Sequence, residues 1–166
     1  MTAEEVKQLL KLEPLAIEGG FFRETYRSRW HVSAEYLPDG IRGSRSIGTA
    51  IYYMITPDTF SALHRLPGTE VFHFYAGDPV VMLQLCPDGS SRTVMLGSDL
   101  LKGHEPQVVV RGHVWQGCRL AGGGEWALMG TTMSPGFDYA DYENADREQL
   151  CAQYPEAAEH IKAYTK

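Results

Sequence analysis

The sequence predicts a mainly β protein, a closed barrel or sandwich of jelly-roll type with short helices at both ends. About eight short runs of β-forming residues follow one another between residues 48 and 133. Turn-forming pairs separate these runs at short intervals, as at Pro57-Asp58, Pro67-Gly68 and Asp88-Gly89. Many short strands with regular turns are typical of all-β sandwiches and barrels.

Helical patterns are confined to the two ends of the chain. Residues 3–11 have apolar positions at helical spacing, and Thr2 before them is a suitable N-cap. A second helix is expected over residues 146–154, and Pro155 is well placed to open a last one.

The β-forming runs define the expected strands. Residues 22–27 form the first, and a polar loop follows to about residue 46. The other strands are expected at residues 48–56, 59–66, 71–76, 80–85, 92–96, 107–110, 114–120 and 126–133. Glycine tolerates positive φ, so the run Gly122-Gly123-Gly124 indicates a hairpin turn before the last strand.

Size and charge restrict the possible partners. A chain of 166 residues fits one domain, and its 43% hydrophobic and 22% charged residues are ordinary for a globular protein. The net charge is −6 and the 15 Lys and Arg residues are scattered, which argues against nucleic acid and against anionic membranes as partners. No signal peptide or membrane span is apparent. Three widely spaced cysteines without a CxxC pair fit buried thiols, so we expect a cytoplasmic protein.

Strand parity places one imidazole and one carboxylate on faces that can both point into the barrel. Alternate residues of a strand share a face. One such face carries Phe60, Ala62, His64 and Leu66, and a face of the next strand carries Glu70, Phe72 and Phe74. An apolar pocket with a few convergent polar groups is typical of a small-molecule site. The alternative is that His64 and Glu70 merely satisfy each other in a core.

The segment around these residues resembles the first cupin motif, in which two histidines, a glutamate and a glycine cross a strand, a turn and a strand. His64, Glu70 and Gly77 fall in register with it, and Leu66 stands at its second histidine. In the second cupin motif, Gln116 stands where a ligand histidine is usual. Two of the four usual metal ligands are therefore missing.

Nearly the whole chain resembles the cupin family 5 proteins, the DUF985 family of the RmlC-like cupin superfamily. The matching stretches are residues 18–26, 49–53, 60–65, 73–79 and 134–142. The chain departs from the family pattern at residues 15–17, at Phe72 and at residues 111–113. The resemblance implies a double-stranded β-helix barrel, a single cupin domain over residues 1–166 and a homodimer.

Three hypotheses for the site remain open. The first is a barrel that only binds a small polar or sugar-like metabolite, with no cofactor. Its aromatic walls would come from Phe60, Phe72, Phe74, Trp115 and Trp126.

The second hypothesis is a metal-free isomerase or epimerase acting on a keto-sugar, similar to the sugar-nucleotide epimerases among cupins. An imidazole titrates near neutral pH, so His64 suits the general base. Glu70 or Asp138 would orient it and Tyr52 or Tyr53 would be the acid, whichever of the two tyrosines faces inward. Arg23 would hold an anionic group of the substrate.

The third hypothesis is a metal-dependent dioxygenase or isomerase. His64, Glu70 and Gln116 would bind a divalent metal, with His113 as a substitute if its turn swings inward. An acidic aromatic segment at residues 137–142 would either cover the barrel mouth or pack on the outer sheet.

Overall fold

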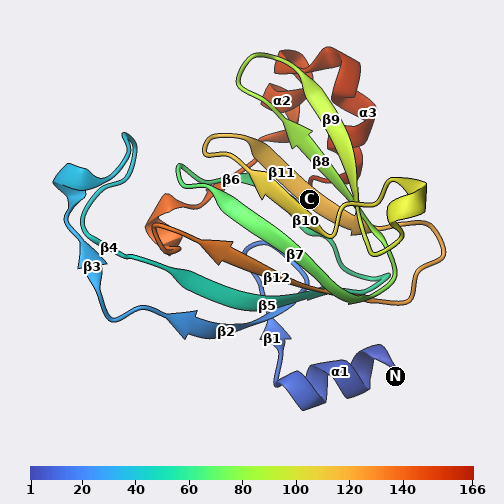
Figure 1. The fold of residues 1–166 in the computed structure, drawn as a ribbon. Coiled ribbons are helices and arrows are strands. Elements are labelled where there is room, and N and C mark those ends of the chain that lie inside the picture. The colour runs from blue at the N-terminus through green and yellow to red at the C-terminus, as the bar shows by residue number, and fades with distance from the viewer.

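Two antiparallel sheets face each other in the computed structural model, which describes residues 1–166 (Figure 1). One sheet has six strands, in the order β1 (Glu13–Pro14), β2 (Phe21–Arg27), β5 (Thr49–Ile55), β12 (Ala127–Met133), β7 (Glu70–Gly77) and β10 (Gln107–Val110). The other has five, in the order β13 (Glu143–Asn144), β6 (Ser61–Arg65), β11 (Trp115–Leu120), β8 (Val80–Leu85) and β9 (Ser91–Leu96). The predicted jelly-roll architecture is confirmed.

The predicted strands agree with the observed ones to within two residues at each end. Four strands were not predicted: β1, β13, β3 (His31–Val32) and β4 (Arg45–Ser46). Each is two residues long, and alternation cannot show in so short a run. β3 and β4 pair with each other on a long excursion between β2 and β5, which projects to the side of the barrel (Figure 1).

The predicted terminal helices are also present. α1 (Ala3–Leu10) begins with a capping box between Thr2 and Glu5. α2 (Arg147–Gln153) is capped by Asp146, and Pro155 opens the short 3₁₀ helix η4 (Pro155–Ala157) before α3 (Ala158–Ala163). Three further 3₁₀ turns are η1 (Ala34–Tyr36), η2 (Leu100–Lys102) and η3 (Tyr139–Asp141).

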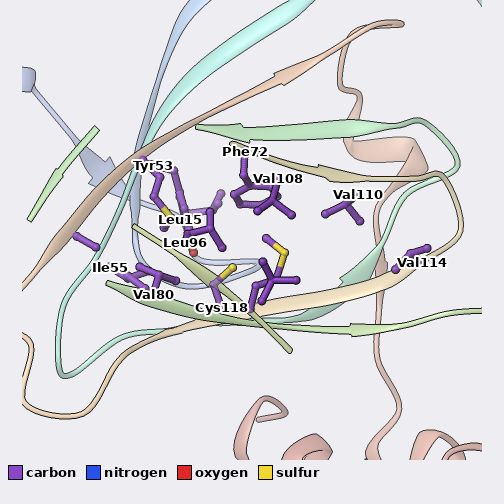
Figure 2. Packing of buried hydrophobic residues seen from close by; sticks show 14 residues of the cluster. Leu15, Tyr53, Ile55, Phe72, Val80, Leu96, Val108, Val110, Val114 and Cys118 are labelled. Atoms are coloured by element: carbon purple, nitrogen blue, oxygen red, sulfur yellow. The ribbon is translucent and has the colours of Figure 1, made fainter. Parts of the chain in front are cut away.

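The main core fills the space between the two sheets (Figure 2). It is built from inward residues of both sheets, including Tyr53, Phe72, Met82, Cys118 and Met129. Burial of these apolar side chains supplies the main driving force for closing the barrel.

The helices cover the outer faces of the sheets (Figure 1). α2 and α3 place Leu150 and Ile161 against Leu63, Leu83 and other residues of the five-stranded sheet. α1 places Val6 against Met54 of the six-stranded sheet. No helix is both long enough and apolar enough to span a bilayer.

Candidate functional site

A cavity of about 70 Å³ lies inside the barrel near the start of β7 and is partly open to solvent. Its polar lining includes Glu18, His64, Glu70, Thr131 and Tyr142. Its apolar lining comes from Leu15, Ile17, Phe22, Ile51, Leu66, Met133 and Phe137. One water needs roughly 10–15 Å³ of such free space, so the cavity has room for a few water-sized groups.

His64 on β6 is held by its own strand. The side chain is 2% exposed, and Nδ1 lies 2.8 Å from the Ala62 carbonyl oxygen. A carbonyl only accepts, so Nδ1 carries a hydrogen and donates it. In the neutral imidazole the lone pair is therefore on Nε2, which lies 3.8 Å from Glu18 Oε2.

Glu70 is the first residue of β7 and is buried. Gln116 donates from Nε2 to Glu70 Oε2 over 2.5 Å, and the same nitrogen lies 3.5 Å from His64 Nε2. Burial raises the pKa of Glu70, and the nearby Glu18 charge raises it further, while His64, Thr131 and Gln116 oppose the shift. The carboxyl group therefore takes up a proton more readily than an exposed glutamate does.

Glu18 was not among the predicted site residues, although it lies within the family-like stretch Glu18-Gly19-Gly20. Gly19 has φ +119°, and a Cβ there would collide with the Phe60 carbonyl oxygen. This glycine lets the chain press against β6, where Ser61 Oγ donates to Glu18 Oε1 over 2.5 Å. The turn thus brings a second carboxylate beside His64.

Tyr142 was also missed as a site residue. Its ring stacks on the His64 imidazole, with centroids 4.9 Å apart and planes 16° from parallel. Its hydroxyl is buried without a hydrogen-bond partner. Burial raises the pKa of this phenol, and Glu18 and Glu70 raise it further.

Two bidentate ion pairs hold the residues on either side of Tyr142. Arg45 donates to Asp141 over 2.9 and 2.6 Å, and Arg65 donates to Glu143 over 2.6 and 2.9 Å. The first pair is nearly buried, with side chains 6% and 10% exposed. The segment over residues 137–142 therefore lines the cavity, which was one of its two predicted locations.

Some of the other expected site residues lie inside the barrel, and the rest lie outside it. Inside the barrel, Gln116 contacts His64 and Glu70. Phe72 is part of the core between the sheets, and Phe74 packs against that core. Neither phenylalanine lines the cavity.

Arg23 of β2 and Tyr52 of β5, both predicted for the site, lie on the outer face of the six-stranded sheet, and Tyr53, the alternative acid, faces inward without lining the cavity. Tyr53 points inward and its hydroxyl donates to the Gly19 carbonyl, so strand alternation turns Tyr52 outward. Arg23 packs there, with its guanidinium 5.5 Å from the Tyr52 ring. Tyr52 as the acid and Arg23 as the anion holder are therefore not supported by their positions.

Three further expected residues are kept out of the cavity by local geometry. β6 carries one extra residue opposite β11, so Ser61 takes the inward position and Phe60 packs outside under Arg119. Trp115 alternates with the inward Gln116 and packs against α2 and α3. Asp138 caps η3 by accepting from the Ala140 amide and does not reach His64.

Trp126, the last of the expected wall residues, packs with the α1 cluster on the outer face.

The residues present do not fit the metal site of the cupin motifs. Leu66 offers no ligand atom, and Gln116 presents its amide nitrogen, a donor, to Glu70. His113 is exposed at a left-handed turn (φ 67°) and lines a separate surface cleft. No group of three or more His, Cys, Asp or Glu side chains is arranged to hold a metal ion.

The raised pKa of Glu70 predicts a pH-dependent effect of Glu70→Gln. Because its pKa is raised above 4.5, ionised Glu70 destabilises the folded chain at higher pH, and this penalty disappears below about pH 4.5. The variant should melt at a higher temperature than the wild type near neutral pH, and the difference should shrink as pH falls. Thermal unfolding followed by circular dichroism measures it. Glu13→Gln, at an exposed position, should show no such trend; a Glu70→Gln chain less stable at every pH would contradict the prediction.

The buried ion pair predicts a large effect of Arg45→Ala. The substitution leaves Asp141 nearly buried and unpaired, which should cost about 3–5 kcal/mol in the free energy of unfolding. Lys162→Ala, which breaks the exposed pair with Glu159, should leave the free energy of unfolding almost unchanged. Urea unfolding of both variants makes the comparison. Equal losses in the free energy of unfolding would refute the larger contribution of the Arg45–Asp141 pair.

Comparison with known proteins agrees with this architecture. Residues 4–145 match the family model described as Cupin superfamily (DUF985). The yeast (Saccharomyces cerevisiae) "Uncharacterized protein YML079W" is 29% identical in an alignment of 133 residues. The alignment covers 75% of this chain and 66% of that protein, just under two thirds of its length.

Solved structures extend the likeness to the full chain. Protein SO0799 from Shewanella oneidensis superposes with a TM-score of 0.87 at 30% identity, covering 100% of this chain and 98% of that one. A hypothetical protein from Leishmania major gives 0.90 at 32% identity, covering 99% of each chain. Bacillus subtilis oxalate decarboxylase shares only the fold, with a TM-score of 0.52 at 13% identity over 89% of this chain and 36% of that one. The chain therefore belongs to the Cupin superfamily (DUF985) family.

Proposed function

We propose that this chain binds a small polar molecule in the cavity around His64 and Glu70. The observation that carries the proposal is that buried polar atoms at this site lack partners. The hydroxyl of Tyr142, which lines the cavity, is buried without a hydrogen bond, and so is Oε1 of Gln116, which lies behind the lining residues His64 and Glu70. A buried polar group without a partner costs about 1–3 kcal/mol, and a bound molecule would remove that cost.

The lining suits a small ring or a sugar-like molecule. Phe22, Phe137 and Tyr142 supply aromatic faces, and Thr131 supplies a hydroxyl. A ligand larger than a few water-sized groups would extend from the cavity toward its open side, where the exposed residues Glu24, Arg27 and Tyr139 line it. The homodimer, the cytoplasmic location and the single-domain organisation stay predictions.

Binding is tested by what copurifies with the chain. Native mass spectrometry of untagged protein should show a small molecule of defined mass on the wild type. His73→Ala should retain it, because His73 bonds Thr132 and does not line the cavity. His64→Ala should lose it.

A thermal-shift screen of polar metabolites provides the second readout. A ligand at a hundred times its dissociation constant stabilises a protein by about 2.7 kcal/mol. Each variant is compared with its own unliganded melting temperature, so a less stable His64→Ala chain remains informative. A wild type that carries nothing and is stabilised by nothing would refute the binding function.

A second candidate function is metal-free proton transfer. Two observations favour it: Nε2 of His64 carries the lone pair, with Gln116 Nε2 3.5 Å away, and the pKa of the neighbouring Glu70 is raised. His64 would then take a proton next to a carbonyl group, and Glu70 or Tyr142 would supply one.

Deuterium exchange tests this second function. Trial keto-sugars incubated with the wild type in D₂O should incorporate deuterium next to the carbonyl, as measured by mass spectrometry. His64→Ala should lose this exchange, and His73→Ala should keep it. Exchange that persists in His64→Ala would remove His64 as the base.

A further inference from the structure

We propose that the cavity selects a small organic cation of the amine or amidine class and rejects anions. The inference rests on the proposed binding function and names the chemical class of its ligand. It follows from the charges and the hydrogen-bonding capacity of the lining residues.

Acidic residues outnumber basic ones around the cavity. Glu18, Glu24 and Glu70 line it, and Arg27 is the one Lys or Arg among its lining residues. Arg27 is already paired: Nε and Nη2 donate to the Glu24 carboxylate, and Nη1 donates to the Phe137 carbonyl. No free cation is therefore left in the lining to receive an anionic ligand.

The polar atoms around His64 are mostly hydrogen-bond acceptors, although the lining hydroxyls of Thr131 and Tyr142 can also donate. Nδ1 of His64 is used by the Ala62 carbonyl, so Nε2 of the neutral ring can only accept. Glu18 binds Ser61 through Oε1, and its Oε2 points to within 3.8 Å of His64 Nε2. Gln116 Oε1 is buried without a donor. A ligand that bonds the lining residues His64 and Glu18 through these atoms must bring hydrogens on nitrogen or oxygen.

The aromatic residues and the volume favour the same ligand class. The faces of Phe22, Phe137 and Tyr142 line the cavity, and aromatic faces attract cations more strongly when water is excluded. A cavity of about 70 Å³ admits a group of a few non-hydrogen atoms. A planar amidinium with N–H donors on two nitrogens meets both conditions.

Three probes of the same shape test the charge preference directly. Acetamidinium, acetamide and acetate have matched heavy-atom skeletons and carry positive, zero and negative charge. Each is titrated into the wild-type chain near neutral pH by NMR, in a buffer free of amines and carboxylates and with a chelator present. We expect saturable binding of acetamidinium, weaker binding of acetamide and none of acetate. Acetate binding best, or no probe binding at all, would overturn the inference.

Two variants locate the binding. Glu18→Gln should weaken acetamidinium by about tenfold or more, because a charge-assisted hydrogen bond is lost, and should leave acetamide little changed. Glu13→Gln, exposed on β1, should change neither affinity. If Glu18→Gln lowered the affinity for acetamidinium and acetamide equally, or changed neither affinity, the assigned role of Glu18 would be contradicted. If Glu18→Gln fails to fold, the comparison of the three probes on the wild type still tests the charge preference of the cavity.

Two further outcomes separate this inference from others. Mn²⁺ or Zn²⁺, titrated without chelator, should not displace acetamidinium; displacement would assign the site to a metal cation instead. If an anion copurifies with the wild type and is lost in His64→Ala, the result supports the proposed binding function and refutes the preference for cations.

Discussion

Burial of ionisable side chains inside an apolar barrel is the constraint on which the site depends. Glu18, His64 and Glu70 meet there, and each would destabilise the core if left without partners. The chain supplies partners from several places: the Ala62 carbonyl for His64, Ser61 for Glu18 and Gln116 for Glu70. Local irregularities make these contacts possible, namely the left-handed Gly19 and the extra residue in β6.

These partners do not satisfy every hydrogen-bonding atom of Glu18, His64, Glu70 and their neighbours. What they leave is mostly acceptor capacity beside a buried imidazole, and that remainder is what a ligand would meet. The charge of Glu18, which together with burial raises the pKa of Glu70, also repels an anionic ligand. In the functions that we propose, the same pair of glutamates would therefore influence stability, proton transfer and ligand choice.

Tyr142 contacts the interior of the barrel, while its neighbours in sequence form ion pairs. Ion pairs to Arg45 and Arg65 hold the residues on either side of it, and these arginines belong to β4 and β6, which are distant in sequence. The tyrosine ring is thereby stacked on His64. Oxalate decarboxylase, at 13% identity, is similar to this chain in fold alone, and fold does not imply function, so its chemistry is not carried over to this site.

Periodicity and turn residues in the sequence were enough to predict the strands, the terminal helices and the jelly-roll class, because these depend on local pattern. The pair His64 and Glu70 also followed from motif spacing and parity. Tertiary structure alone decided which aromatic residues face the cavity. An extra residue in β6 shifts Phe60 outward, and parity within β5 sends Tyr52 out and Tyr53 in. It also decided that Glu18 and Tyr142 join His64, since contacts between segments this distant in sequence arise only when the sheets close.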